Sequence, residues 1–357
     1  MNSTTLSIVY VGPLTHGGTC LQRLVALRNL GHAVEAVDTA RRQPKLRLFR
    51  LIHETATKTY HRLIDSEPSN AAMLALALQK RPDIVWVDKG VLIEGRTLQA
   101  ILDQVPSVVL ISYSPDDMLN VQNQSRQYLS AIKVYHLHVT TKSYNVAELT
   151  QKGARSVVFV DNAFAPERHR PIPLSEEERM EFGGPVGFIG YFEEARERSI
   201  QCLADSGLHV RVWGHGAWRR THRCNLRVEQ SPLWADDYAR AICAFDINLC
   251  FLRKANRDRQ TTRSIEIPAC GAFMLAERTD EHLRLFREGE EAEFFSSDEE
   301  LVEKVRYYLV HPERRERIAA AGRARCINSG YSNADRIRLI LQRYADVVET
   351  RGCGATH

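Results

Sequence analysis

Long apolar runs are missing from this 357-residue chain. No stretch approaches the roughly 18 consecutive apolar residues that a membrane span needs, and no charged segment followed by an apolar core opens the sequence. The eight cysteines include no C-x-x-C pair, and several stand inside apolar runs, as is typical of reduced thiols. We therefore expect a cytoplasmic protein without a transmembrane segment.

An excess of one charge is also missing. The 48 Lys and Arg residues are nearly balanced by 44 Asp and Glu, which leaves a formal net charge of +4. The basic residues are scattered, apart from a local concentration between Arg253 and Arg263. This excess is too small to indicate a nucleic-acid surface, so we expect no nucleic-acid partner.

Two common nucleotide-binding signatures are absent. The glycine-rich segment Gly12-Pro-Leu-Thr-His-Gly17-Gly18-Thr19 follows an apolar run and opens a helical pattern. No G-K-[ST] ends it, and it lacks the G-x-G-x-x-G spacing of dinucleotide-binding proteins. ATP-binding and NAD-binding interpretations therefore lose their best support.

What the sequence does contain is a regular alternation of β-rich apolar runs with segments of helical period. This alternation indicates a parallel sheet covered by helices on both faces, hence an α/β fold. In the first part of the chain we expect strands at 6–11, 33–37, 84–87, 108–111, 137–139 and 157–160, and helices at 19–30, 45–65, 69–80, 97–104 and 143–152. Together they predict a Rossmann-like domain over residues 1–168.

The same alternation then restarts. A linker is expected at 165–174, where Pro166, Pro171 and Pro173 favour an extended connection. Beyond it, strands are expected at 186–189, 209–213, 247–251 and 273–276, with helices starting at 193 and 234. This predicts a second Rossmann-like domain over 184–332, followed by a helix at 333–350 that packs back on the first domain.

The strongest candidate site is the sequence Arg263-Ser-Ile-Glu266-Ile-Pro-Ala-Cys-Gly271, a helical pattern with an early acid and a glycine stop. In doubly wound sheets, ligands bind outside the carboxyl ends of the strands, where helices begin. There Glu266 could accept hydrogen bonds from ribose hydroxyls and Arg263 could clamp phosphate oxygens. The alternative is a dipole-stabilising acid beside a solvated surface arginine.

This segment also carries a family resemblance. "RSIEIPACGAFMLAERTDEHLRLFREGEEAEFF" and the following "SSDEELVEKVRYYLVHPERRERIAAAGRARC" resemble the C-terminal region of group 1 glycosyltransferases, specifically the CgeB-like, spore-maturation type. The resemblance implies a GT-B fold, with two Rossmann-like domains facing a central cleft. It also implies transfer of a sugar from a nucleotide diphosphate donor to an unknown acceptor, with retention of configuration and with neither metal nor cofactor.

The resemblance also assigns residues to the donor. In group 1 enzymes two acids eight positions apart serve the donor; Glu266 matches the second, which contacts ribose, and Asp258 occupies the first position. "VGFIGYFEEARERS" is similar to the family's first nucleotide-domain strand and loop, which puts Gly190 and Arg196 at the diphosphate. A solvated, charge-paired helix is the alternative for Arg196.

The next predicted strand ends in "VRVWGHGAW". The resemblance puts Trp213 and Gly214 where the nucleotide base or ribose lies, whereas a buried tryptophan that packs between the two domains is the alternative. "YVGPLTHGGTCLQRLVALRNLGHAVEAVD" is similar to the CgeB-like opening, in which the loop with Gly12, Gly17 and Gly18 meets the donor phosphate or the acceptor. A tight turn would also explain those three glycines.

Two acids are the candidates on the acceptor side. Asp116 and Asp117 follow the predicted strand 108–111, so they should lie at the carboxyl edge of the first sheet. A carboxylate there could take the acceptor's proton, although S-P-D-D is also an ordinary turn sequence. His136 and His138 stand two apart on a predicted strand, but no third ligand has metal-site spacing, so we expect no metal.

Two other functions remain open. The first is a non-catalytic nucleotide-sugar-binding or spore-coat-associated protein of the same fold. It remains possible because Asp258 stands where the family has a glutamate, whose side chain is one methylene longer. The second is a nucleotide-sugar epimerase, which shares the architecture but needs an acid and base pair about the sugar ring.

Overall fold

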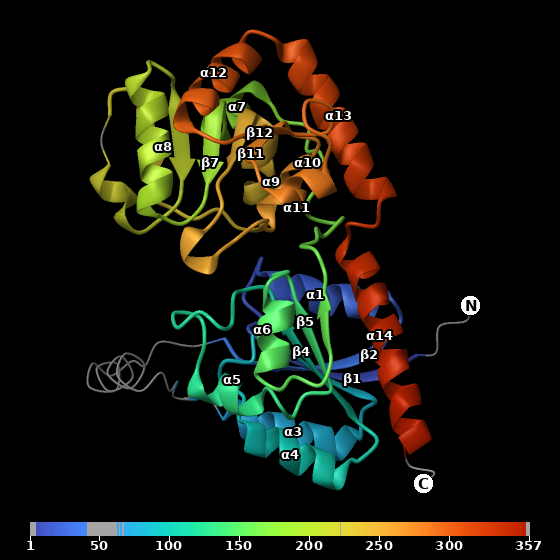
Figure 1. The fold of residues 1–357 in the computed structure, drawn as a ribbon. Coiled ribbons are helices and arrows are strands. Elements are labelled where there is room, and N and C mark those ends of the chain that lie inside the picture. Colours follow the sequence, from blue (N-terminus) through green and yellow to red (C-terminus); the bar gives the residue numbers. More distant parts are fainter. Residues whose placement is uncertain (1–4, 41–62, 64, 66–67, 222, 355–357) are drawn as a thin grey trace. The chain divides into compact units, whose positions relative to one another are not determined.

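The chain folds into two compact units (Figure 1). The computed structural model describes residues 5–40, 63, 65, 68–221 and 223–354. The first unit comprises residues 1–161 and 333–357, and the second comprises 162–332. The helix expected at 45–65 falls almost wholly outside the described residues. The second unit begins before the proline-containing segment at 165–174, which is neither helix nor strand.

The first unit is built on a parallel sheet of six strands in the order β2-β1-β3-β4-β5-β6. The strands are β1 (Ser7–Gly12), β2 (Ala33–Asp38), β3 (Ile84–Asp88), β4 (Val109–Ser114), β5 (Leu137–Thr140) and β6 (Val157–Phe159). β3 and β4 are buried along their whole length, as expected for central strands of a sheet covered on both faces. The strand order reverses between β1 and β3. In such a sheet, ligands bind near the carboxyl ends of the two strands at this point.

Helices cover both faces of this sheet. They are α1 (Thr19–Asn29), α3 (Ser69–Lys80), α4 (Gly95–Gln104), α5 (Arg126–Ala131), α6 (Asn145–Gln151) and α14 (Asn333–Gly354). α3 and α4 lie together on one face, where Met73 and Leu98 join the buried cluster of β1 and β3 (Figure 1). On the other face α14 packs against α1, and its Ile337 and Ile340 are buried. The C-terminal helix therefore belongs to the first unit.

The second unit contains another parallel six-stranded sheet, in the order β12-β11-β10-β7-β8-β9. Its strands are β7 (Gly184–Ile189), β8 (Val210–Trp213), β9 (Leu226–Glu229), β10 (Phe245–Cys250), β11 (Met274–Glu277) and β12 (Glu293–Phe295). The order reverses between β7 and β10. β9 and β12 were not expected from the sequence, because these short edge strands mix charged and apolar residues and so lack a continuous apolar run.

The helices of the second unit follow the alternation. They are α7 (Glu176–Phe182), α8 (Glu194–Asp205), α9 (Ala235–Ala244), α10 (Arg263–Ala269), α11 (Asp280–Leu285), α12 (Asp298–Leu309) and α13 (Pro312–Asn328). Ser175 and Glu178 form a capping box at the start of α7. The sequence analysis did not predict this helix, because none of its residues is buried and it therefore has no apolar period. The expected α/β fold with two doubly wound sheets is confirmed.

A buried ion pair closes the carboxyl edge of the first sheet. The Arg23 guanidinium of α1 binds both carboxylate oxygens of Asp88, at 2.6 Å from Nε and 3.1 Å from Nη2. The Tyr10 hydroxyl donates to the same carboxylate at 2.6 Å, and the guanidinium lies 4.3 Å from the centroid of the Tyr113 ring. Burial, and then the Asp88 charge, raises the pKa of Tyr10 well above its usual value. This network ties α1 to β1, β3 and β4.

We predict that Asp88→Asn lowers the free energy of unfolding by about 3–5 kcal/mol, because it leaves the Arg23 charge buried without its counter-ion. Urea denaturation of the full chain measures this. Lys80→Ala is the matched control: its pair with Glu35 is 41% and 56% exposed, and such a pair contributes at most about 1 kcal/mol. Equal losses in the two variants would contradict the assignment.

Candidate functional site

Two arginines meet where the strand order of the second sheet reverses. β7 is followed by Gly190 and then by α8, whose third residue is Arg196. β10 is followed by a loop that leads to Arg263, the first residue of α10. Because the strands are parallel, both loops leave the same edge of the sheet. This is the edge where doubly wound proteins bind their ligands.

The two guanidinium groups lie over the same aromatic ring. Their central carbons are 5.6 Å (Arg196) and 5.8 Å (Arg263) from the centroid of Phe188. Arg196 is only 3% exposed, and its Nη1 donates to the Tyr191 carbonyl at 3.0 Å. Burial, together with the Arg263 charge, lowers the pKa of Arg196 to about 10. The two like charges thus act on each other, with Arg196 buried and Arg263 half-buried.

Part of the hydrogen-bonding capacity of this pair is unused within the protein. The Nε atoms of Arg196 and Arg263 are buried without a hydrogen-bond partner. Neither guanidinium forms an ion pair within 4.0 Å among the residues that the structure describes. Buried donors of this kind call for a partner, and a phosphate group matches the planar fork of a guanidinium. The arrangement is therefore suited to binding an oxyanion.

Two acids lie close enough to act on this pair. The charges of Glu193 and Asp258 act to raise the pKa of Arg196, against burial and Arg263. Glu193 is engaged by Arg253 at 3.2 Å, and Asp258 accepts a hydrogen bond from the Asn256 side chain at 2.7 Å. The structure thus places Asp258 within electrostatic reach of Arg196, and its contact with a donor stays a prediction.

Glu266 stands one turn after Arg263 and is 5% exposed. The Tyr238 hydroxyl donates to its Oε2 at 2.6 Å, and His169 Nε2 lies 3.6 Å from Oε1. His169 Nδ1 accepts from the Ala165 amide at 3.0 Å, so the ring proton is on Nε2 and faces the carboxylate. The carboxylate orientation is therefore held by two side chains that the sequence analysis missed.

No sequence signal identifies Tyr238 and His169 as neighbours of Glu266. Tyr238 comes from α9, and His169 from the segment that precedes α7. Burial, followed by the Glu266 charge, raises the pKa of Tyr238 well above its usual value, whereas the Arg263 charge acts in the opposite direction. Arg263 therefore lies within electrostatic reach of the hydrogen bond that holds Glu266.

The glycines of the second unit allow two loops to touch. The Gly190 amide donates to the Trp213 carbonyl at 2.9 Å, and a Cβ added at Gly214 would lie 2.1 Å from the Gly190 carbonyl oxygen. A side chain at Gly214 therefore cannot be accommodated without moving backbone. This close approach brings the carboxyl ends of β7 and β8 together, and it is a structural requirement in addition to any role in ligand binding.

Trp213, at the end of β8, is held by contacts with other side chains of the second unit. Its indole stacks on Phe182 with ring centroids 6.1 Å apart, and its Nε1 donates to the Phe182 carbonyl at 2.9 Å. The side chain is buried with Ala241 and Phe245 in an apolar cluster. Its ring and its donor are thus both used in packing within the second unit.

A cavity of about 300 Å³ adjoins Arg196 at the same edge of the sheet. Its polar lining includes Ser199 of α8, Lys254 of the loop after β10, and Arg278, which follows β11. Lys254 pairs with Glu277, and Arg278 pairs with Glu288 and Glu300. Of the basic side chains that line this cavity, Arg196 is therefore the one whose charge is not met by an ion pair within the described residues.

The glycine-rich loop of the first unit leads from β1 into α1. Gly12 ends β1 close to Asp88, since a Cβ added there would lie 3.1 Å from the Asp88 Cβ. Gly17 has a φ of +75°, a conformation that glycine adopts at least cost, and Gly18 caps α1 and donates its amide to the Thr15 carbonyl at 2.9 Å. The local backbone thus accounts for these glycines, and their contact with a ligand stays a prediction.

The two acids after β4 have different surroundings. Asp116 pairs with Lys89 at 3.0 Å, and the two side chains are 29% and 36% exposed. Burial acts to lower the pKa of Lys89, but the Asp116 carboxylate together with Cys20 and Asp88 outweighs it, and the pKa is raised. Asp117 is fully buried, and it accepts hydrogen bonds from the Leu119 amide and the Asn145 side chain. Of the two acids, Asp116 is therefore the one that solvent can reach.

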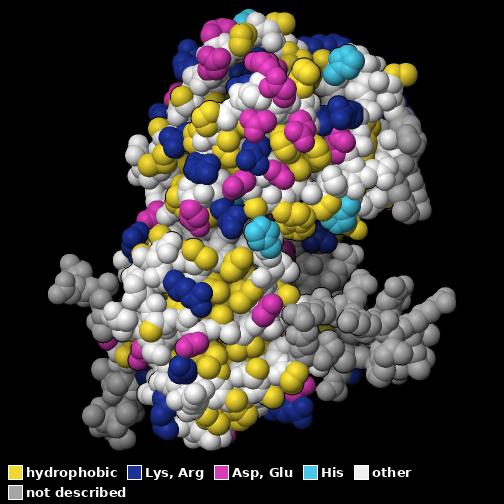
Figure 2. All heavy atoms as spheres, turned by 180° about the vertical axis from the view of Figure 1, so that it is seen from behind, with side chains coloured by type: hydrophobic (Ala, Val, Ile, Leu, Met, Phe, Trp, Pro, Cys, Tyr) yellow, Lys and Arg dark blue, Asp and Glu magenta, His cyan; other side chains and the backbone are white. Residues whose placement is uncertain are grey.

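The distribution of surface charge and of possible metal ligands bears on other classes of ligand. Over the face shown in Figure 2, Lys and Arg side chains are interspersed with Asp and Glu. Within the described parts of the chain, no three His, Cys, Asp or Glu side chains are grouped as metal ligands would be. No helix among the described residues has the length and apolar character needed to cross a membrane.

Comparison with known proteins agrees with this geometry. A family model described as "Glycosyl transferase-like" matches residues 196–342, and no curated protein matches the chain. Anabaena HepE in complex with UDP and glucose is 13% identical with a TM-score of 0.63, over 96% of this chain and 100% of that one. Sucrose-phosphate synthase from Thermosynechococcus elongatus is 12% identical with a TM-score of 0.65, over 96% and 100%.

A third similar structure, assigned as a UDP-N-acetylglucosamine 2-epimerase from Listeria monocytogenes, is 11% identical with a TM-score of 0.53, over 95% of each chain. Identities this low establish the fold alone. These likenesses cover nearly the whole chain and show the GT-B fold. The family match contains Arg196, Asp258, Arg263 and Glu266.

We predict that substitution of the two neighbouring acids destabilises the protein to different extents. Asp117→Ala leaves buried donors unpaired and should lower the free energy of unfolding by about 1–3 kcal/mol. Asp116→Ala removes a half-exposed pair and should cost less than about 1 kcal/mol. Urea denaturation followed by circular dichroism compares them. If Asp116→Ala proved the more destabilising variant, the structural assignment of Asp117 would be wrong.

Proposed function

We propose that the protein transfers a glycosyl group from a nucleotide diphosphate sugar, with the donor held by the second unit. The observation that carries this proposal is the pair Arg196 and Arg263, whose Nε donors are buried without a partner over Phe188. A diphosphate offers these two cations several oxygens at once. The family match over residues 196–342 and the shared GT-B fold support the same ligand class.

The chemistry of such a site rests on charge stabilisation. When the bond between the sugar's anomeric carbon and the diphosphate of the donor breaks, negative charge develops on the leaving diphosphate. Preorganised cations in a largely desolvated site stabilise that charge without reorganisation, which is how Arg196 and Arg263 would lower the barrier. Glu266 would bind the ribose hydroxyls, with Tyr238 and His169 holding its carboxylate in position.

The acceptor side is assigned to the first unit. Asp116, paired with Lys89 at the carboxyl edge of the first sheet, would take the proton of the attacking hydroxyl. Retention of configuration and independence of metal belong to the proposal through the resemblance to group 1 enzymes. So does the narrower placement in the CgeB-like branch. Because Anabaena HepE was crystallised with UDP and glucose, UDP-glucose is the first donor to test.

Two rival functions give different outcomes in one assay. A transferase releases UDP when the correct donor and acceptor are combined. A non-catalytic binding protein binds the donor without turnover, and an epimerase converts the sugar of UDP-N-acetylglucosamine without releasing UDP. Screening a panel of nucleotide sugars against hydroxyl acceptors, with UDP release and sugar configuration both recorded, separates the three.

We predict that Arg196→Gln and Arg263→Gln each weaken UDP binding at least about tenfold, because each removes a charge-assisted hydrogen bond of about 1.5–3 kcal/mol. Isothermal titration calorimetry measures the affinity. Arg223→Gln is the matched control in the same unit, since Arg223 pairs with Asp205 at 2.8 Å on the surface. UDP affinity that stays unchanged in both site variants would refute the donor site.

A second prediction concerns the ribose. If Glu266 accepts from the ribose 2′-hydroxyl, the protein should bind UDP at least about tenfold more tightly than 2′-deoxy-UDP, and Glu266→Ala should abolish this preference. Tyr238→Phe should reduce the preference, because it removes the 2.6 Å bond that orients the carboxylate. Calorimetric titration with the two nucleotides gives the ratio directly. A preference that survives in Glu266→Ala would place the ribose elsewhere.

A further inference from the structure

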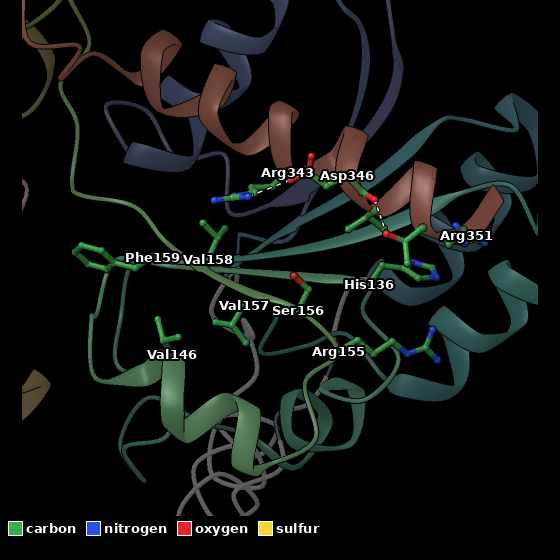
Figure 3. A pocket seen from close by; sticks show the side chains of 12 residues that line it. His136, Val146, Arg155, Ser156, Val157, Val158, Phe159, Arg343, Asp346 and Arg351 are labelled. Carbon is green, nitrogen blue, oxygen red and sulfur yellow. Dashed lines mark hydrogen bonds and ion pairs between the residues drawn. The ribbon is translucent and has the colours of Figure 1, made fainter. Parts of the chain in front are cut away.

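A pocket of about 640 Å³ lies over the outer edge of the first sheet (Figure 3). β6 is the last strand in the order of that sheet, so one of its edges has no neighbouring strand. The pocket extends around this edge, between Val146 of α6 on one side and the second half of α14 on the other. It is thus formed entirely within the first unit.

The two ends of this pocket differ in chemistry. Figure 3 shows Val146, Val158 and Phe159 at one end, and His136, Arg155 and Arg351 at the other. Ser156, which directly precedes β6, lies at the basic end, and Phe159, the last residue of β6, lies at the apolar end. The pocket is therefore amphipathic along its length.

The basic end carries charge that the protein does not neutralise nearby. Arg343, which also lines the pocket, pairs with Asp346 at 3.1 Å. Arg155 and Arg351 have no ion pair with any described carboxylate, and they bind backbone carbonyls instead. Arg155 Nε donates to the Lys133 carbonyl at 3.2 Å, and Arg351 donates to the carbonyls of Val108 at 2.8 Å and Pro106. Most of their N–H groups stay available for an anion.

His136 adds a neutral donor to this end. The Leu110 amide donates to His136 Nδ1 at 3.0 Å, so the neutral ring carries its proton on Nε2. Burial, together with the charges of Arg351 and Arg155, lowers the pKa of His136 to about 4. At neutral pH the ring is therefore uncharged. Both guanidinium groups also lie within electrostatic reach of it, so the three side chains form one cluster of donors.

This cluster is separate from the candidate donor and acceptor residues. His136 directly precedes β5, Arg155 and Ser156 precede β6, and the Arg351 guanidinium binds Val108 just before β4. All three side chains therefore lie at the amino edge of the first sheet. Asp116 and the glycine-rich loop lie at the carboxyl edge, the opposite end of the same strands, so the proposed transfer reaction does not use this pocket.

We propose that this pocket binds a small amphipathic anion. A phosphate or carboxylate head contacts Arg155, Arg351 and His136, and an apolar body extends along β6 towards Val146 and Phe159. Two cations without a carboxylate partner select for the negative head, and guanidinium groups favour oxyanions over other anions. The volume is much larger than an inorganic phosphate needs, and the apolar end selects against a purely polar ligand.

Octyl phosphate, used below the concentration at which it forms micelles, is the probe. Isothermal titration calorimetry on the full chain compares it with inorganic phosphate, which lacks the apolar body, and with octanol, which lacks the charge. Octanoate tests whether a carboxylate head suffices. We expect octyl phosphate to bind at least about tenfold more tightly than phosphate or octanol, a difference of about 1.4 kcal/mol.

Three variants assign the binding to this pocket. Arg155→Gln and Arg351→Gln should each weaken octyl phosphate binding at least about tenfold, and the effect should shrink as salt is added. Arg343→Gln is the matched control, because its charge is already paired with Asp346, and it should change the affinity less than about twofold. UDP affinity should stay unchanged in all three variants, which also verifies that they are folded.

The proposal is overturned if octyl phosphate binds no more tightly than octanol, or if Arg155→Gln binds it as the unmodified chain does. Arg351 also holds backbone carbonyls, so a folding defect in Arg351→Gln would leave Arg155→Gln as the decisive variant. In a variant that circular dichroism shows to be folded, loss of UDP binding together with octyl phosphate binding would show that one site serves both, which also contradicts the proposal.

Discussion

The position of two arginine charges beside one buried ring determines how the second unit works. Phe188 is the penultimate residue of β7. The guanidinium carbons of Arg196 and Arg263 lie 5.6 Å and 5.8 Å from the centroid of its ring. Bringing two like charges together in a desolvated place costs free energy, and the lowered pKa of Arg196 reflects that cost. An anionic ligand removes this penalty, so the same arrangement that destabilises the unliganded protein favours binding of a diphosphate. Glu266, held by Tyr238 and His169 rather than by an arginine, stays available as an acceptor for hydroxyl groups.

The two units share one architecture but differ in whether the arginines at the carboxyl edge of the sheet are neutralised within the protein. In the first unit, the charge at the point where the strand order reverses is neutralised internally, since Arg23 is bound by both oxygens of Asp88. In the second unit, the corresponding arginines have no ion-pair partner among the described residues. A paired guanidinium stabilises the connection between helix and sheet, whereas an unpaired one binds a ligand. This contrast supports placing the donor in the second unit and the acceptor beside the more exposed Asp116 of the first.

A similar contrast appears on α14. Arg343 is neutralised by Asp346 one turn away, but Arg351 binds only carbonyls and shares a pocket with Arg155 and His136. Since the chain as a whole has a formal net charge of only +4, these unpaired charges come from local placement rather than from composition. An anion site at the amino edge of a sheet is independent of the ligand site at its carboxyl edge. The proposed anion would therefore bind the first unit without touching the residues assigned to transfer.

The sequence by itself determined the α/β alternation, ten of the twelve strands and the segments that carry Asp258, Arg263 and Glu266, because central strands are continuous apolar runs and helices have their own period. It did not reveal β9 and β12, since these short edge strands mix charged and apolar residues and so contain no continuous apolar run. Only the tertiary structure decided that Asp117 is buried while its neighbour Asp116 is accessible, and that Trp213 packs on Phe182. It alone also brought Tyr238 and His169 to Glu266, because contacts between residues far apart in the chain depend on how the elements pack.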